Sequence, residues 1–435
     1  MGTVAIIGAG LGGIALVANL GLRGYRLRLH DVDEARIAKA RARGGLDVEG
    51  LVEGFAPLEL VTPRLAPAVE GADVIIVVTG SHFHADVARG LARVVRDGQT
   101  ILLIQGGTGG SLVVRRELRA AGCQAAIDVA EMDNYPYSLA WPEPTRVRMT
   151  IVKRFLQIAS LPARRTAAVV ARLAPAFPQA VAAPSILTTG LTNMNATLHV
   201  ANMVGNIGRL EGSGNAYRFY AEGYTTSLVT LLEALDAERL AIADAFGVQV
   251  PGIHQWLLQT YGLGGASLPE TFHRLTHEPT GPYQWTPTPT SLQHKYVVED
   301  VPCGLVAMSS LGRAAAVVTP VMDGLISLTS AMLRRDFRAE GRNLDQPGRQ
   351  ERGRDPVDRG DGPHRLSGRR YSISRSARSR SEVGIGRLSA LAVARLTTSS
   401  YFDGCSMGRS AGLRPLRIRS TKVAARCQTS TRSPP

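Results

Sequence analysis

The chain has 435 residues, with 50 lysines and arginines against 36 aspartates and glutamates, and a formal net charge of +14. Residues 346–435 hold 19 basic and 6 acidic side chains, whereas residues 1–345 hold 31 basic and 30 acidic ones. A nearly neutral body lacks the basic surface of a nucleic-acid-binding protein. Because 345 residues exceed what one core usually fills, we expect a globular protein of two domains followed by a basic tail.

Cysteine usage and the apolar segments indicate a cytoplasmic location. The four cysteines are Cys123, Cys303, Cys405 and Cys427, and their spacing matches neither a metal site nor a redox motif. No secretory signal is evident, because the apolar start runs directly into a glycine loop. The apolar stretch Leu311–Leu333 contains Arg313, Pro320 and Asp323, which favours a buried helical region over a membrane span.

The first half of the chain alternates short β-branched runs with amphipathic segments. The predicted strands are Val4–Ile7, Arg26–His30, Leu58–Thr62, Val74–Val78 and Thr100–Ile104, and the predicted helices are Ile14–Leu22, Glu34–Arg43, Ala85–Val95 and Leu112–Ala121. This pattern is typical of α/β proteins, in which helices cover both faces of a parallel sheet. We therefore expect a doubly wound, Rossmann-type dinucleotide-binding domain over residues 1–182.

The second half predicts an all-helical domain over residues 183–345. Leu228, Leu231, Leu232 and Leu235 give one apolar helical stripe. Five prolines between Leu268 and Leu292 predict an extended loop there, a candidate lid over a site. The tail, residues 346–435, is rich in arginine and serine and is expected to be disordered. It is either a basic arm with nonspecific affinity for nucleic acid or acidic membrane, or the product of a shifted reading frame.

The sequence Gly8-Ala9-Gly10-Leu11-Gly12-Gly13 lies between the first predicted strand and the first helix. In this context the pattern predicts a dinucleotide site. Gly8 permits a tight turn, Gly10 lets the backbone approach a pyrophosphate, and Gly13 lets the helix pack closely on the strand. The diphosphate would then lie at the helix N-terminus. The alternative is a glycine-rich turn that binds nothing.

Asp31 ends the second predicted strand, where a carboxylate accepts hydrogen bonds from the adenosine ribose. Asp33 and Glu34 follow it, so a 2′-phosphate would meet negative charge before Arg36. We therefore expect NAD, with NADP as the alternative. Asp33 is also placed to cap the next helix.

Two further loops follow predicted strands, over residues 79–84 and 105–110. Ligands bind at this edge of such a sheet, so these loops either approach the nicotinamide half of the cofactor or are simple turns. His82 and His84, in the first loop, are interpreted as loop residues rather than catalysts.

Asn195, His199, Asn202 and Asn206 form one polar stripe on an otherwise apolar helix predicted over Thr192–Leu210. Buried amides need partners, so this stripe favours a functional face lining a cleft over ordinary packing. The run Lys295–Pro302 places two acids before a proline; on its spacing alone it is either part of a site or a surface turn.

Together these features resemble the octopine/nopaline (opine) dehydrogenase family over nearly all of residues 1–345. The resemblance rests on Gly8–Gly13, Asn195–His199, Phe219–Thr225 and Glu299–Val306. It implies an NAD(P)-dependent enzyme that condenses an amino acid with an α-keto acid and reduces the resulting imine. The alternatives are a hydroxyacid or glycerol-3-phosphate dehydrogenase and a non-catalytic NAD sensor.

The resemblance also implies roles for individual residues. His199 would be the general acid/base, Asp300 its partner, and Asn195 would hold the substrate or the imidazole ring. Lys295 lies where the family is expected to have an arginine that anchors a substrate carboxylate, and Glu131 is assigned to the amino-acid substrate. No metal is expected. Partners are small molecules, and a homodimer is one alternative for the assembly.

Overall fold

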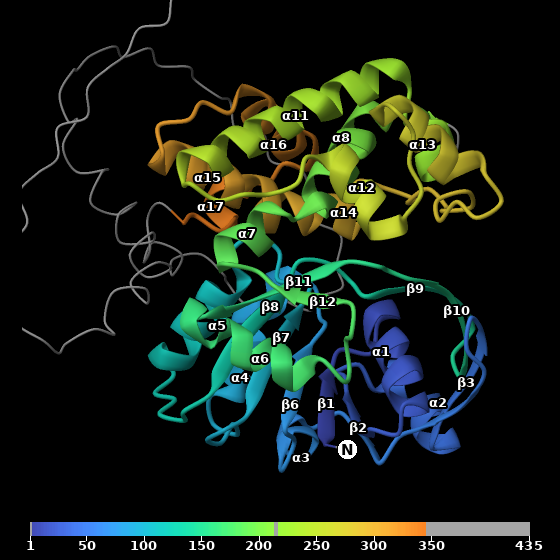
Figure 1. The fold of residues 1–435 in the computed structure, drawn as a ribbon, viewed down its shortest axis with the longest axis vertical. Coiled ribbons are helices and arrows are strands. Elements are labelled where there is room, and N and C mark those ends of the chain that lie inside the picture. Colours follow the sequence, from blue (N-terminus) through green and yellow to red (C-terminus); the bar gives the residue numbers. More distant parts are fainter. Residues whose placement is uncertain (1, 213–215, 345–435) are drawn as a thin grey trace, which may run out of the picture. The chain divides into compact units, whose positions relative to one another are not determined.

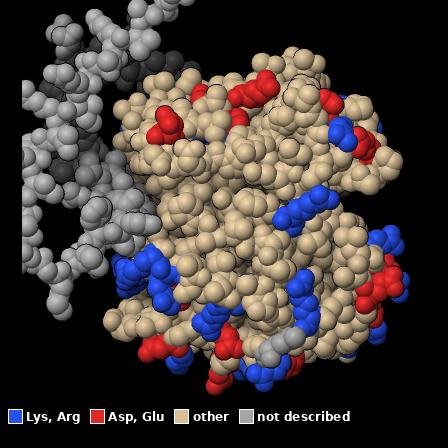
Figure 2. All heavy atoms as spheres, viewed as in Figure 1, with Lys and Arg blue, Asp and Glu red and all other residues tan. Residues whose placement is uncertain are grey.

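The computed structural model describes residues 2–212 and 216–344, so the predicted tail lies outside the described residues (Figure 1). Basic and acidic side chains are interspersed on the face drawn in Figure 2. This agrees with the nearly neutral charge of residues 1–345. Among the described residues, no helix is both long and apolar enough to span a bilayer.

An eight-stranded sheet forms the centre of the N-terminal region. Its strands are β1 (Thr3–Ile7), β2 (Arg26–His30), β5 (Leu60–Thr62), β6 (Val74–Val77), β7 (Thr100–Ile104), β8 (Asp128–Met132), β11 (Leu156–Leu161) and β12 (Ala180–Ala182). The spatial order is β12-β11-β8-β7-β6-β1-β2-β5. The sheet is parallel except where β11 pairs with β8 in the antiparallel direction. The predicted Rossmann-like class is confirmed.

Helices cover both faces of this sheet, and the β-strand alternation decides which side chains meet them. The helices are α1 (Leu11–Leu22), α2 (Glu34–Arg43), α3 (Leu65–Val69), α4 (His84–Leu91), α5 (Gly110–Ala120) and α6 (Thr166–Leu173), with short 3₁₀ turns η1 (Ser81–Phe83) and η2 (Ala163–Arg165). Val4 and Ile6 pack in the core that contains residues of α1, α2 and α6, whereas Ala5 and Ile7 face the core with α3, α4 and α5. Successive side chains of a strand point to opposite faces, so both faces of β1 are buried.

A second, four-stranded sheet was not predicted. It comprises β3 (Gly45–Gly50), β4 (Gly54–Pro57), β9 (Tyr137–Glu143) and β10 (Arg146–Val152), in the order β4-β3-β10-β9. Helix α1 packs against this sheet as well as against β1 and β2. Because α1 has a sheet on either side, every residue of its central stretch 13–21 is buried. This explains why its sequence is apolar around the whole helix.

The C-terminal region is helical, as predicted. Its helices are α7 (Ile186–Leu191), α8 (Met194–Gly205), α9 (Ile207–Gly212), α10 (Phe219–Gly223), α11 (Thr226–Ala245), α12 (Ile253–Tyr261), α13 (Leu268–His277), α14 (Lys295–Val298), the π-helical turn η3 (Val301–Leu305), α15 (Val306–Ala314), α16 (Pro320–Leu333) and α17 (Phe337–Glu340). Leu228, Leu232 and Leu235 are buried along α11. The exact boundary at residues 182 and 183 stays a prediction.

The expected extended loop over Leu268–Leu292 is wrong in its first part. Ser267 caps α13 by accepting a hydrogen bond from the Glu270 amide, and Pro269 lies in the first turn of the helix. Proline is tolerated there because the missing N–H would have no intrahelical partner. Only the segment after α13 is irregular, and its residues 279–289 line the cavity described below.

Candidate active site

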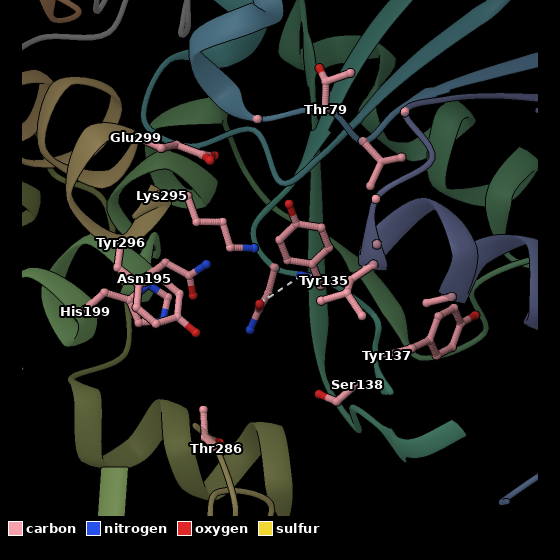
Figure 3. Close-up of a pocket in the computed structure, with 18 of the residues that line it drawn as sticks. Thr79, Tyr135, Tyr137, Ser138, Asn195, His199, Thr286, Lys295, Tyr296 and Glu299 are labelled. Carbon is pink, nitrogen blue, oxygen red and sulfur yellow. Dashed lines mark hydrogen bonds between the residues drawn. The ribbon is translucent and has the colours of Figure 1, made fainter. Parts of the chain in front are cut away.

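A cavity of about 1820 Å³ extends from the glycine loop to the helical region. Its lining includes Gly8, Gly10, Gly12 and Asp31 from the sheet region and Asn195, His199, Lys295 and Glu299 from the helical region. Figure 3 shows Asn195, His199, Lys295 and Tyr296 on one side of the cavity, opposite Tyr135, Tyr137 and Ser138. The folded chain thus brings together most of the residues singled out in the sequence.

The glycine loop leaves its backbone open toward the cavity. Gly8 has φ +117°, which is unfavourable for other residues. A Cβ on Gly13 would lie 1.9 Å from the Gly8 carbonyl oxygen, whereas a Cβ on Gly10 would meet no atom within 4 Å. Gly10 immediately precedes α1, and no side chain caps this helix. The first amide groups of α1 are therefore available to an anion such as a pyrophosphate.

The Asp31 carboxylate holds the glycine loop in place. It is buried beside the cavity and accepts hydrogen bonds from the amides of Ala9 at 2.7 Å and Asp33 at 2.9 Å. Asp33 caps α2 through the Ala35 amide and pairs with Arg36 at 3.1 Å. Each Asp31 oxygen retains capacity for a further hydrogen bond. Its predicted contact with the ribose stays a prediction.

His199 has partners on both ring nitrogens. Nδ1 lies 2.8 Å from Asp300 Oδ2 and Nε2 lies 2.9 Å from the Tyr220 hydroxyl. Tyr296 stacks on the ring with centroids 3.7 Å apart. Burial lowers the pKa of His199, and the ammonium groups of Lys295 and Lys153 add to this effect, whereas Asp300 raises it. The carboxylate thus favours the protonated imidazole and fixes its orientation.

The other members of the predicted asparagine stripe divide into two groups. Asn195 lines the cavity, and its amide donates to Gln105 Oε1 at 2.8 Å. Asn202 donates to the Phe219 carbonyl oxygen, and Asn206 donates to that of Gly223. These two amides hold α10, which carries Tyr220, against α8. The helix predicted over Thr192–Leu210 is interrupted at Asn206, between α8 and α9.

Lys295 and Glu299 bring charge to the cavity from α14 and the residue after it. The Lys295 ammonium has neither a hydrogen bond nor an ion pair within the described ranges 2–212 and 216–344. Glu299 accepts a hydrogen bond from the Ser81 amide at 2.9 Å. Burial and the neighbouring Asp300 raise the pKa of Glu299. A carboxylate substrate would therefore meet an unpaired cation at Lys295.

The position of Glu131 does not support its predicted contact with substrate. Its side chain is fully buried and is not among the residues that line the cavity. One carboxylate oxygen accepts hydrogen bonds from the Ser111 amide and hydroxyl, and the other accepts one from Thr189. Because Ser111 lies in the first turn of α5, Glu131 stabilises this helix N-terminus and ties it to α7. It is therefore a structural residue.

Of the two predicted loops, the one after β6 lines the cavity and the one after β7 does not. Residues 78–80 and 82–83 line the cavity. His84 is buried beside Arg342, which also donates to the carbonyl oxygens of Ser81, Gly106 and Thr108. The loop at 105–110 contacts the helical region, since the Thr108 amide donates to the Cys303 carbonyl oxygen. None of its residues is among the cavity lining.

Sequence reasoning missed Lys153, Tyr220 and Tyr296 as cavity residues. Lys153 follows β10 and is 7% exposed, and its ammonium donates to Asn134 Oδ1 at 2.7 Å. The sequence offered two signals: lysine is rare, with 4 among 50 basic residues, and Tyr220 belongs to a segment that resembles the family.

Among the described residues, no group of three or more histidine, cysteine, aspartate or glutamate side chains is arranged to bind a metal.

Comparisons with known proteins agree with this geometry. Residues 182–333 match the family model for the NAD/NADP octopine/nopaline dehydrogenase alpha-helical domain. The chain is 36% identical over 347 residues to an opine dehydrogenase of Arthrobacter sp. (strain 1C), covering 80% of this chain and 95% of that one. It is 24% identical to D-nopaline dehydrogenase of Agrobacterium tumefaciens (strain T37), covering 76% of this chain and 85% of that one.

The fold is also that of solved opine dehydrogenases. An octopine dehydrogenase in complex with NADH and agmatine superimposes with a TM-score of 0.66 at 20% identity, covering 81% of this chain and 96% of that one. A yersinopine dehydrogenase with bound NADP⁺ gives a TM-score of 0.58 at 16% identity, covering 77% and 91% of the two chains. The sequence match over 95% of the Arthrobacter enzyme is decisive. The chain belongs to the octopine/nopaline (opine) dehydrogenase family.

Proposed function

We propose that this chain, an NAD(P)-dependent oxidoreductase acting on CH–NH bonds, condenses an amino acid with an α-keto acid and reduces the resulting imine. The products are a secondary-amine dicarboxylate, the oxidised cofactor and water. The observation that carries the proposal is a His199–Asp300 pair in the same cavity as an open glycine loop. The reduced nicotinamide, when bound, supplies the hydride.

The chain's residues supply the proton transfers. The amine attacks the keto carbon to give a carbinolamine, which must lose its hydroxyl group as water. Protonated His199 would donate a proton to the departing hydroxyl oxygen, and neutral His199 would accept a proton from the attacking amine. General acid/base catalysis of this kind contributes about 100- to 10,000-fold to the rate. Asp300 stabilises the imidazolium between these steps. Asn195, held by Gln105, is a fixed amide for the substrate.

The residues around the glycine loop fit a dinucleotide. Gly8 and Gly13 bring the helix close to the strand, and Gly10 leaves space where a phosphate would approach. We favour NAD over NADP because Asp31, Asp33 and Glu34 precede Arg36, whose guanidinium already pairs with Asp33.

We also expect the enzyme to act in the cytoplasm. The spacing of the four cysteines matches neither a metal site nor a redox motif, which fits a reducing compartment. A homodimer remains one proposal for its assembly.

A substrate screen tests the proposal directly. NADH and NADPH oxidation are measured with pyruvate alone and with pyruvate plus each member of an amino-acid panel, and the product is identified by mass. The expected result is cofactor oxidation that requires both substrates. Turnover with pyruvate alone would indicate a hydroxyacid dehydrogenase instead. Binding of NADH without turnover of any pair would indicate a sensor.

A further inference from the structure

The proposed reaction joins two carboxylates in one product, and this inference rests on that function. Three basic side chains line the cavity within the described part of the chain: Arg36, Lys153 and Lys295. Arg36 follows the Asp31 strand end and pairs with Asp33. Lys153 and Lys295 both act electrostatically on His199. The reacting end of the cavity therefore has one cation for each carboxylate.

Lys153 is buried without a compensating anion in contact. Its ammonium donates one hydrogen bond, to Asn134 Oδ1 at 2.7 Å, and lies 6.0 Å from the centroid of the Tyr261 ring. Within residues 2–212 and 216–344 no carboxylate approaches it closely enough for an ion pair. Asp133 acts on it only at longer range. An ammonium has three N–H donors, so two remain available.

Asn134 adds a further donor beside this ammonium. Its Oδ1 accepts hydrogen bonds from Lys153 and from the Tyr135 amide. This fixes the orientation of the side-chain amide, and its Nδ2 is buried with no partner among the described residues. A buried donor without a partner is destabilising, so a ligand that accepts this hydrogen bond would be favoured. Asn134 and Lys153 both line the cavity, so the cluster offers unused N–H donors there, which is the chemistry of an anion site.

We propose that Lys153 and the Asn134 amide bind one substrate carboxylate, while Lys295 binds the other. The two cations belong to different parts of the fold, since Lys153 follows β10 of the second sheet and Lys295 begins α14. A substrate pair held at both ends would place the forming C–N bond beside His199. Lys153 is then a specificity-determining residue, which selects acids over amines or ketones that lack a carboxylate.

The titration of Lys153 agrees with this role. Burial lowers the pKa of Lys153 to about 7, and Asp133 opposes the shift. A carboxylate in contact would favour the charged ammonium and raise that pKa again. Carboxylate binding at this position should therefore be strongest below about pH 7 and weaken as the free ammonium loses its proton above it.

Binding of two small product analogues tests the proposal without turnover. Iminodiacetate is a secondary amine with two carboxylates, and N-methylglycine is a secondary amine with one. Their dissociation constants are measured by calorimetry on the full chain with saturating NAD⁺. We compare Lys153→Met, Lys153→Gln and, as a matched control, Lys39→Met, which removes an exposed lysine of α2 outside the cavity. Glutamine keeps a donor for Asn134, so it protects the fold if methionine does not.

The wild-type protein and Lys39→Met should bind iminodiacetate about 10- to 100-fold more tightly than N-methylglycine, the effect of hydrogen bonds to a charged group. In both Lys153 variants this ratio should fall to about one. A ratio unchanged in Lys153→Gln, or near one in the wild-type protein, overturns the proposal. This outcome is separate from the substrate screen: no turnover with any pair would remove the proposed reaction and leave the anion site intact.

Kinetics of Lys153→Gln then show which carboxylate is bound. If the site takes the amino-acid carboxylate, the KM of the amino acid rises and that of pyruvate stays within about threefold. If it takes the keto-acid carboxylate, the pattern reverses. If neither the KM of the amino acid nor that of pyruvate differed between Lys153→Gln and the wild-type enzyme, the proposed carboxylate site would be contradicted.

Discussion

The two ends of the cavity present different chemistry. At the glycine-loop end, the candidate binding groups are backbone amides: Gly10 leaves open space in front of them, while Gly8 and Gly13 let the helix approach the strand. At the helical end, the groups are side chains such as His199, Asp300 and Lys295, drawn from segments about one hundred residues apart. In the proposed function, the first end recognises a dinucleotide through local backbone geometry, and the second carries out chemistry that depends on tertiary packing. Variants at each end should therefore change different measurable quantities.

Replacing His199 by alanine should have the largest effect. Loss of the general acid/base is expected to lower kcat about 100- to 10,000-fold. NADH affinity, measured by fluorescence titration, should stay within about threefold, because His199 lies at the other end of the cavity. His273→Ala, at an exposed position on α13, is the control. Full activity of His199→Ala in a verified opine assay would refute the assigned mechanism.

Gly10→Ala should change cofactor binding without changing stability. Gly10 has φ −75°, which alanine adopts, and its Cβ would meet no protein atom within 4 Å. The methyl group would instead occupy the space for the pyrophosphate. We expect NADH affinity to fall about 10- to 100-fold, equivalent to losing a hydrogen bond to a charged group.

Gly13→Ala provides the contrast at this end. Its Cβ would clash with the Gly8 carbonyl oxygen, so the midpoint of thermal unfolding should fall in addition to the NADH affinity. If Gly10→Ala bound NADH as the wild-type protein does, the predicted diphosphate position would be wrong.

Sequence patterns predicted local features better than distant ones. The strands Arg26–His30 and Thr100–Ile104 and the helix Glu34–Arg43 have the predicted bounds, because apolar periodicity and capping are local properties. The second sheet escaped prediction because β3 pairs with β10 across about a hundred residues, and because β3 and β4 are short and contain glycine. No local pattern encodes such a pairing.

The same distinction applies to the site. The glycine loop follows from its position between a strand and a helix, whereas the pairing of His199 with Asp300 was implied only by resemblance to the family. Glu131 was assigned to substrate by the same resemblance. Its burial and its contact with Ser111 depend on how α5 packs, which no local sequence pattern shows. Lys153 was missed because a lone lysine after a strand usually lies in solvent.

Asp300→Asn should change the pH dependence of the rate. Asp300 raises the pKa of His199 against the lowering caused by burial, so its loss lowers that pKa further. At pH 7 a smaller fraction of imidazole would then be protonated, and kcat/KM should fall about tenfold. The deficit should shrink as the pH is lowered. Glu211→Gln, an exposed charge loss on α9, should leave the profile unchanged. A deficit that is constant across pH would contradict an electrostatic role.

Tyr220→Phe should have the smallest effect. In the structure the Tyr220 hydroxyl lies 2.9 Å from His199 Nε2, the nitrogen that remains for substrate once Nδ1 is held by Asp300. Burial and nearby charge raise the pKa of Tyr220 well above its usual value, so the hydroxyl stays protonated. We expect substrate to displace it from Nε2. Because one neutral hydrogen bond is lost, kcat should change by no more than about tenfold. A loss as large as that of His199→Ala would instead make Tyr220 an obligatory proton relay.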